Sequence, residues 1–251
     1  MIASRPLTQC RLIEQLRALR SAVVLTLLAG ALLAFIGVLA SAAPKTSEAQ
    51  SRFEQAYRGS QSLAVSFLEN YKENGQLVRS EAGTAYFRRP GKMRFEYESP
   101  GKDLFLIDGK TAWFYVPSDH TATRVPAKQS SDWRTPLALL AGEARLSRIC
   151  SNVEIRASEK AQSPEGVVLQ CMLKGNSAAD AGLVLLEVSP VSGNLLRVAI
   201  REAGGVTVEF QFKNWRFNPP LPDSQFRFTP PVGTAIVNGE SLGVPGTSAL
   251  P

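Results

Sequence analysis

The apolar residues of this 251-residue chain change their period near position 63, which limits the folds that it can adopt. Leu63, Val65 and Phe67 occupy every second position, and a period of two is typical of a strand with one buried face. Similar runs then recur roughly every 8–12 residues between turn residues, as in antiparallel β proteins. Strands are expected near 63–73, 76–89, 92–99, 103–108, 111–116, 151–158, 166–174, 182–189, 195–202, 206–214 and 225–228.

Short turns are expected between several of these strands. Asn74-Gly75 and Asp108-Gly109 predict two-residue hairpin turns, because these residues tolerate a positive φ. Pro90-Gly91 predicts a turn of another type. Turns this short join neighbouring antiparallel strands.

Two helical segments interrupt the β pattern. Phe53, Ala56 and Tyr57 form an apolar stripe that predicts a helix ending at Gly59. The segment TPLALLAG, residues 135–142, predicts a short helix with a proline at its first position. The expected fold is mainly β (α+β): one curled antiparallel sheet, or unclosed β-barrel, of about 10–11 strands with the helices on one face. The helices would then form a lid over a hydrophobic cavity.

The first 42 residues are of a different kind. Four arginines precede an uncharged apolar run from Ala22 to Ala42, and this order is typical of an export signal. Cleavage after Ala42 is expected, with an uncleaved anchor as the alternative, because about 20 apolar residues can span a bilayer. The chain therefore divides into a signal (1–42), a domain (43–233) and a flexible tail of small and polar residues (234–251), with the domain expected outside the cytoplasm.

The net charge excludes one class of partner. The formal charge is +6, but residues 1–42 hold four Arg and one Glu, which leaves +3 for the remainder. Without a cluster of Lys and Arg, this charge gives no nucleic-acid footprint.

Cleavage would also remove Cys10 and leave Cys150 and Cys171. In an exported chain such a pair indicates a disulfide. A bridge across this loop would stabilise the fold by about 3 kcal/mol in the chain-entropy model. Two buried free thiols are the alternative.

Groups that could carry catalysis are scarce. His120 is the only histidine, and it stands beside Asp119 in a segment that reads as a hairpin tip. Adjacency of this kind is not the geometry of a catalytic triad. The chain has neither G-x-S-x-G nor G-x-G-x-x-G, and no clustered Cys and His. We therefore expect no enzyme, no metal and no cofactor.

Large apolar side chains are concentrated between positions 87 and 115. Core packing beneath a helix is one interpretation. The other is a pocket for an apolar ligand, because two helices would cover the apolar face of the sheet incompletely. The side chains concerned are Phe87, Met93, Phe95, Tyr97, Phe105, Trp113, Phe114 and Tyr115.

The stretch GTAYFRRPGKMRFEYESPGKDLFLIDGKTAWFYVP, then TPLALLAG, then FRFTPP at 226–231, resembles the periplasmic outer-membrane lipoprotein carrier family, LolA. The resemblance covers about residues 46–232. It implies an unclosed β-barrel whose helical lid closes a hydrophobic cavity. It also implies a monomer that carries the acyl chains of lipoproteins from an inner-membrane ABC-type transporter to an acceptor at the outer membrane.

The resemblance assigns roles to single residues. Arg89 matches the family's arginine that hydrogen-bonds the lid helices and holds the empty cavity closed; a solvated turn arginine is the alternative. Arg88 is expected on the opposite face, exposed to solvent. Met93 stands where the family has an aromatic residue. The expected cavity residues are Phe67, Phe87, Met93, Phe95, Phe105, Trp113, Leu137 and Leu140.

Two other functions fit the same fold. One is a periplasmic lipid-binding domain that senses or regulates. The other is a carrier of free lipids or glycolipids, because an apolar pocket alone does not distinguish these cargoes from lipoproteins.

Overall fold

The computed structural model describes residues 46–130, 135–142, 144–174, 183–202 and 204–239. Within them, twelve strands form one sheet in the order β12-β6-β5-β4-β3-β2-β1-β11-β10-β9-β8-β7. The strands are β1 (Ser62–Glu73), β2 (Gln76–Arg88), β3 (Lys92–Ser99), β4 (Leu104–Ile107), β5 (Thr111–Val116), β6 (Thr121–Pro126), β7 (Cys150–Ile155), β8 (Val167–Leu173), β9 (Leu183–Val188), β10 (Leu195–Arg201), β11 (Val206–Phe217) and β12 (Ala235–Asn238). Since β12 and β7 end this sheet without pairing with each other, the predicted mainly β, unclosed fold is confirmed.

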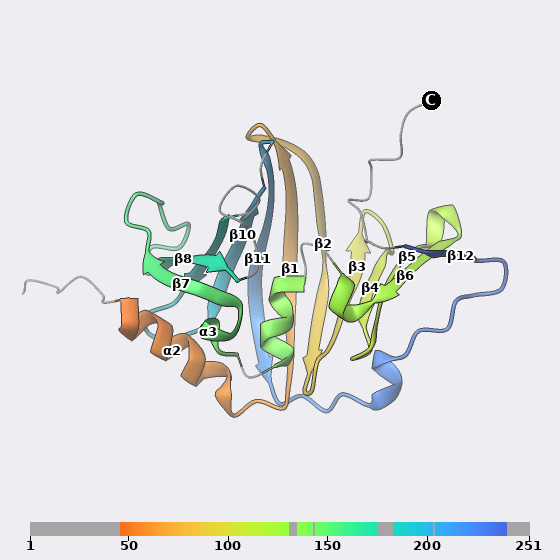
Figure 1. Cartoon of the computed structure of the whole chain (residues 1–251), viewed down its shortest axis with the longest axis horizontal. Helices are drawn as coiled ribbons and strands as arrows, with labels where there is room; N and C mark the ends of the chain where they lie inside the picture. Colours follow the sequence, from red (N-terminus) through yellow and green to blue (C-terminus); the bar gives the residue numbers. More distant parts are fainter. Residues whose placement is uncertain (1–45, 131–134, 143, 175–182, 203, 240–251) are drawn as a thin grey trace, which may run out of the picture. The chain divides into compact units, whose positions relative to one another are not determined.

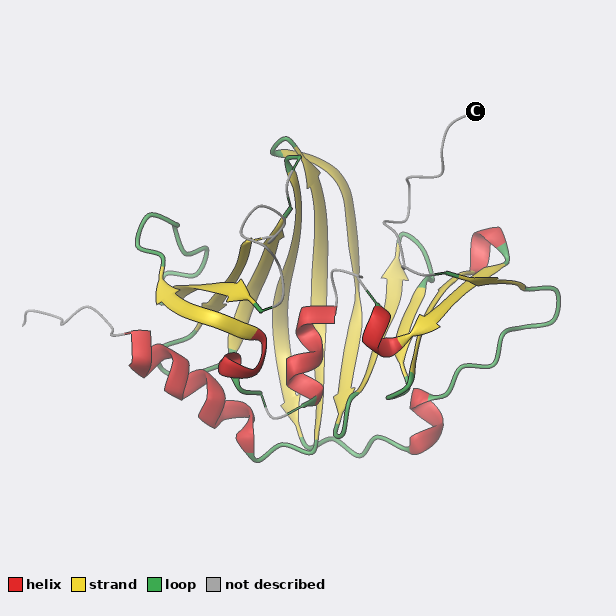
Figure 2. Ribbon diagram, in the orientation of Figure 1, coloured by secondary structure: helices red, strands yellow, loops and turns green. Residues whose placement is uncertain are grey.

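The helical segments of the described chain are short. They are the α-helices α2 (Thr46–Arg58) and α3 (Leu146–Ile149), and the 3₁₀ segments η1 (Pro117–Asp119), η2 (Ala127–Gln129), η3 (Thr135–Ala141) and η4 (Asp223–Phe226). Figure 1 shows α2, α3 and η3 on the same side of the sheet, and Figure 2 shows η3 in front of the central strands. η3 contacts β2 and β3, while α2 contacts β7 and β8. We call α2, α3 and η3 the lid, and the sheet face beneath them the inner face.

The period-two pattern in the sequence produces this inner face. In β3, Met93, Phe95 and Tyr97 are buried, and the residues between them are partly exposed. The helical stripe is equally well formed, because Phe53 and Tyr57 of α2 are both fully buried. One apolar cluster therefore fills the space between the lid and the sheet.

Two turns show how local residues set the strand connections. At the β1–β2 hairpin, Asn74 and Gly75 have φ values of 48° and 80°, which matches the predicted two-residue turn. The second prediction is wrong, because the β4–β5 connection contains three residues. There the Asp108 carboxylate accepts hydrogen bonds from the backbone N–H groups of Lys110 and Thr111, both at 2.8 Å.

The C-terminal region differs from the prediction in two ways. The strand expected near 225–228 is wrong: η4 occupies Asp223–Phe226, within a proline-rich stretch that cannot donate to a strand ladder. The tail expected to be flexible from position 234 includes β12, which pairs in parallel with β6. All four residues of β12 are exposed, so no burial pattern marks it in the sequence.

β6 was also missed, since its core-facing residues, Ala122 and Val125, are small and unevenly spaced. The predicted signal, residues 1–42, lies outside the described residues. None of the described helices is both long enough and apolar enough to cross a membrane.

Candidate functional site

Aromatic rings from five strands form the centre of the inner face. The Phe95 ring lies 5.2 Å from that of Phe67, 5.8 Å from Phe87, 6.3 Å from Phe105 and 5.9 Å from Phe210, measured between centroids. These distances are those of paired aromatic rings in protein cores. The apolar surface predicted to line a cavity is thus packed against itself in this structure.

Seven of the eight predicted cavity residues belong to this cluster, and each is at most 4% exposed. The eighth, Trp113, was assigned to the wrong face. Its ring lies 5.4 Å from that of Phe228, beneath the guanidinium of Arg124. The core-facing residues of β5 are its neighbours Ala112 and Phe114, and consecutive strand residues point to opposite faces. The seven are Phe67, Phe87, Met93, Phe95, Phe105, Leu137 and Leu140.

Helix α2 is fixed to the sheet through Tyr57. The Tyr57 ring packs edge-on against Trp215 with centroids 5.3 Å apart. Its hydroxyl accepts a hydrogen bond of 2.9 Å from the backbone N–H of Leu195. Burial raises the pKa of the Tyr57 hydroxyl, against a smaller opposing effect of that hydrogen bond, so the group stays neutral. The last turn of α2 is therefore held beside β10 and β11.

Helix α3 is attached at both of its ends. At its start, the Glu54 carboxylate of α2 accepts a hydrogen bond of 3.1 Å from the backbone N–H of Leu146. At its end, Cys150 is joined to Cys171 of β8 by a disulfide with a Cα–Cα distance of 5.4 Å. Lys174 also donates from Nζ to the Ser147 carbonyl at 2.6 Å. α3 is thus the more firmly anchored part of the lid.

The turn between β2 and β3 contacts both other parts of the lid. Arg89 donates from Nη1 to the Arg58 carbonyl at 2.7 Å and from Nη2 to the Tyr57 carbonyl at 2.8 Å. The backbone N–H of Gly91 donates to the Ala141 carbonyl of η3 at 2.9 Å. A guanidinium is favourable here, because the last carbonyls of a helix carry a partial negative charge. We call residues 89–91 the latch turn.

Arg88 does not lie free in solvent as expected. It does point away from the lid, but Nη1 donates to the Leu221 carbonyl at 2.8 Å and Nη2 contacts the Asp223 carboxylate. These partners are more than 130 positions away in the sequence, so no local pattern could have indicated them.

A polar group on the inner face was also missed. Glu69 and Glu81 lie directly opposite each other on β1 and β2, and both are almost fully buried. The Tyr97 hydroxyl donates to the Glu69 carboxylate, and Arg79 lies 3.0 Å from Glu81. The sequence did contain a signal for Glu69, because it lies two positions after the inward-facing Phe67 in the same strand.

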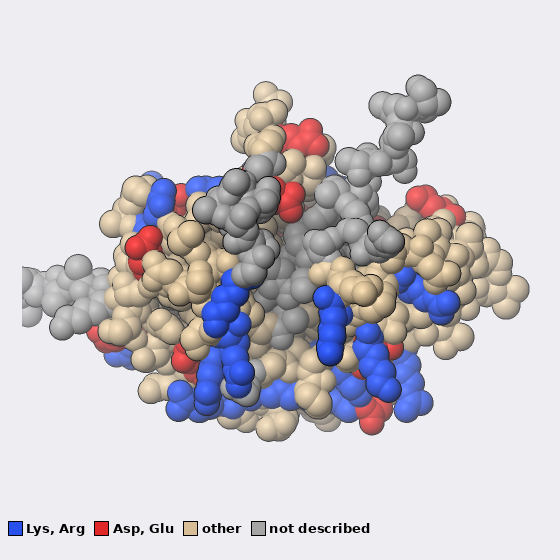
Figure 3. Space-filling model, viewed as in Figure 1, with Lys and Arg blue, Asp and Glu red and all other residues tan. Residues whose placement is uncertain are grey.

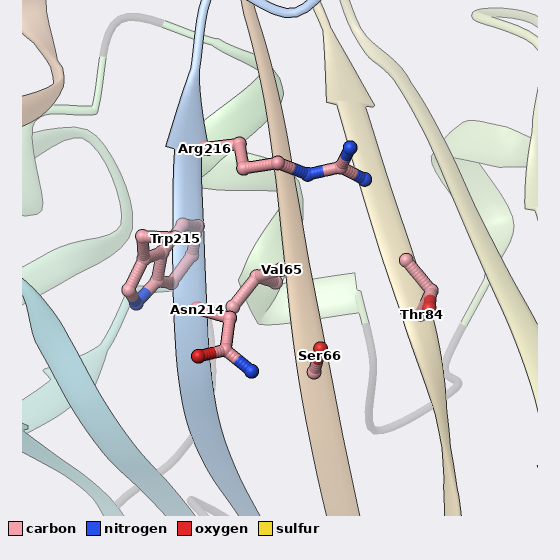
Figure 4. Close-up of a pocket in the computed structure, with 6 residues that line it drawn as sticks. All are labelled: Val65, Ser66, Thr84, Asn214, Trp215 and Arg216. Atoms are coloured by element: carbon pink, nitrogen blue, oxygen red, sulfur yellow. The ribbon is translucent and has the colours of Figure 1, made fainter.

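Two pockets lie away from the aromatic cluster, and neither is lined by the predicted cavity residues. A pocket of about 310 Å³ opens on the outer face, where the β1–β11 register shifts; Figure 4 shows Arg216 reaching across β1 there. A pocket of about 320 Å³ lies between η3 and α3. The first is lined by Val65, Ser66, Thr84, Asn214, Trp215 and Arg216, and the second by Leu139, Gly142, Ala144, Arg145, Arg148 and Ile149.

Within the described ranges, no three His, Cys, Asp or Glu side chains are grouped so that they could hold a metal ion. His120 lies in the tight connection between β5 and β6, where it has a left-handed backbone with φ 50°. The distinctive feature of the described chain is an apolar face beneath a lid, which the latch turn joins to the end of β2 through three hydrogen bonds.

An unclosed, mostly antiparallel sheet with short helices over its apolar inner face places the chain among the mainly β proteins. The chain belongs within that class to the LolA family, since the model for "Outer membrane lipoprotein carrier protein LolA" matches residues 58–229.

Relatives of the chain bear the same name. It is 28% identical over 200 residues to the outer-membrane lipoprotein carrier protein of Chromobacterium violaceum, an alignment that covers 79% of this chain and 92% of the relative. It is 29% identical to the protein of the same name from Nitrosomonas europaea, and this alignment covers 69% of this chain and 83% of the relative. A crystal structure of a LolA-superfamily protein from Nitrosomonas europaea aligns with 14% identity, 74% and 99% coverage and a TM-score of 0.42.

Proposed function

We propose that this protein carries the acyl chains of lipoproteins through the periplasm, from an inner-membrane ABC-type transporter towards the outer membrane. Membership of the LolA family supports the class of cargo. The observation that carries the proposal is the latch turn, because Arg89 and Gly91 hold α2 and η3 over the aromatic cluster through three hydrogen bonds. Breaking these three hydrogen bonds would release α2 and η3 from the latch turn while the sheet stays folded.

The packed aromatic cluster is the empty, closed form in this proposal. Acyl chains would enter between the lid and the inner face, and would replace contacts such as that between Phe67 and Phe95. Ligand entry would also break the bonds from Arg89 to the Tyr57 and Arg58 carbonyls. Closure and cargo therefore compete for the same apolar surface.

This competition allows the cargo to be released, although acyl chains bind tightly to apolar surfaces. Each CH₂ group removed from water contributes about 0.8 kcal/mol, so one palmitoyl chain contributes on the order of 12 kcal/mol. A site that matched a membrane in full would not release its cargo. The side chains around Phe95 pack against one another again when the lid closes, and this reburial lowers the free-energy cost of releasing the cargo.

The test is native mass spectrometry of the protein purified, without removal of lipid, from the periplasm of cells that make lipoproteins. The expected result is a co-purifying acylated lipoprotein that dissociates in detergent. Phospholipid or glycolipid alone would replace the proposal with general lipid transport. A folded protein without any bound mass would contradict carriage altogether.

A further inference from the structure

The chain after β11 runs along the ends of β1, β2 and β3, where it contacts Ser62, Arg88 and Arg94. We call residues 218–239 the C-terminal strap; Figure 1 shows it in blue, leading from the end of β11 to β12. It begins where Asn218 accepts a hydrogen bond of 2.8 Å from the backbone N–H of Gln61, and Ser62 donates to the Pro219 carbonyl at 2.6 Å. Further along, the Phe228 ring packs against that of Tyr115.

One carboxylate of the strap joins the two strand ends that flank the latch turn. Arg88 ends β2, Lys92 begins β3, and the two residues are register partners. The Asp223 carboxylate accepts hydrogen bonds from both, with a distance of 2.8 Å to Lys92 Nζ. The Arg88 guanidinium also lies over the Phe226 ring, 5.6 Å from its centroid. Figure 3 shows Lys and Arg side chains gathered along this lower margin of the domain.

The same turn therefore has contacts on both faces of the sheet. On the outer face Asp223 holds its two ends together. On the inner face Arg89 and Gly91 hold α2 and η3. We propose that Asp223 is a positioning residue, which fixes the latch turn in the conformation that closes the lid. The effect of Asp223 on the latch turn does not depend on the proposed function. Only the further step, in which lid closure regulates cargo binding, rests on that function.

Electrostatics explain why a carboxylate is needed at this position. Without its negative charge, Arg88 and Lys92 would face each other as two like charges across the ladder, which is unfavourable. The hydrogen bonds from Lys92 and Arg88 and the charges of both hold the pKa of Asp223 below its usual range, so the carboxylate is ionised at neutral pH. An asparagine at this position keeps the size of the side chain but removes the charge. The ionic contacts that hold Arg88 and Lys92 together would then be lost.

The test is hydrogen–deuterium exchange of the cargo-free protein, followed by mass spectrometry. In D223N, peptides that contain Gly91 and η3 should exchange about threefold faster than in the wild type, because local opening is read directly by exchange. Peptides of β8 and β9 should be unchanged. D223E should restore slow exchange, since it returns the charge. D119N is the matched control, because its carboxylate is also exposed and contacts only the neighbouring Ser118 in the described structure.

Unchanged exchange at Gly91 in D223N would overturn the proposal, and so would equal acceleration in D119N. If D223N does not fold, K92Q removes one side of the clamp and is judged by the same criterion. The readout involves no lipid, so a failure of the proposed carrier function, detected by native mass spectrometry, is distinguished from a failure of this inference.

Discussion

Replacing Arg89 with leucine isolates the contribution of the latch to cargo exchange. The mutation removes two charge-assisted hydrogen bonds, of 2.7 and 2.8 Å, to the last carbonyls of α2. Such bonds contribute about 1.5–3 kcal/mol each when buried. These are partly exposed, so we assign about 1 kcal/mol to each and about 2 kcal/mol to the pair. The ratio of closed to open protein should then fall about thirtyfold.

This loss should strengthen cargo binding. If only the open form binds, the apparent dissociation constant equals the intrinsic value divided by the fraction open. R89L should therefore bind a fluorescent palmitoyl lipopeptide up to about thirtyfold more tightly and release it more slowly to acceptor vesicles, because affinity differences lie mostly in the dissociation rate. The assays are an equilibrium titration and stopped-flow transfer.

The control is R58L, which removes an exposed arginine side chain of the same helix turn but leaves its carbonyl in place. It should bind and release like the wild type. Wild-type affinity and release in R89L, with the protein folded, would refute the latch. Equal effects in R89L and R58L would assign the change to general charge at the end of α2.

Three further predictions concern stability and pH. Replacing Cys150 and Cys171 by serine should lower the free energy of unfolding in urea by about 3 kcal/mol, because their bridge closes a loop with a sequence separation of 21; an unchanged midpoint would contradict this. Phe95→Ala should lower it by about 3–5 kcal/mol, since the ring is fully buried, and a loss below 1 kcal/mol would show that the cluster is loosely packed. The pKa of Asp223 is lowered in the folded protein. Its charge therefore stabilises the closed latch turn fully above the usual aspartate pKa of about 4, and this stabilisation is lost as the pH falls through the lowered pKa. Exchange at the latch turn, corrected for intrinsic rates, should therefore accelerate on acidification in the wild type but not in D223N.

The sequence predicted those features that depend on local periodicity. The alternation of Met93, Phe95 and Tyr97 with charged residues indicated both β3 and its buried side. The spacing of Phe53 and Tyr57 indicated α2 and the side that it buries. Both predictions succeeded because one repeating apolar face decides the conformation of the whole segment.

Features that depend on distant partners could not be predicted. Trp113 is as apolar as its neighbour Phe114, so side-chain type alone did not show which of the two faces the core. The aromatic partner that covers it, Phe228, comes from the strap. β12 likewise exists because β6 offers it an edge. In each case the deciding contact is made across more than 100 positions of sequence.

The pair Arg88-Arg89 shows how a local pattern and distant contacts combine in one mechanism. Arg88 ends β2 and Arg89 begins the latch turn, and their side chains point to opposite faces of the sheet, as consecutive extended residues do. They therefore meet different partners, Asp223 outside and α2 inside. The latch that results is small, at about 2 kcal/mol, against on the order of 12 kcal/mol for one palmitoyl chain. A latch of this size cannot prevent loading, but it can change the rate of exchange by more than tenfold. Arg89 is therefore expected to set how readily cargo is passed on, while the aromatic cluster around Phe95 determines whether apolar cargo is held.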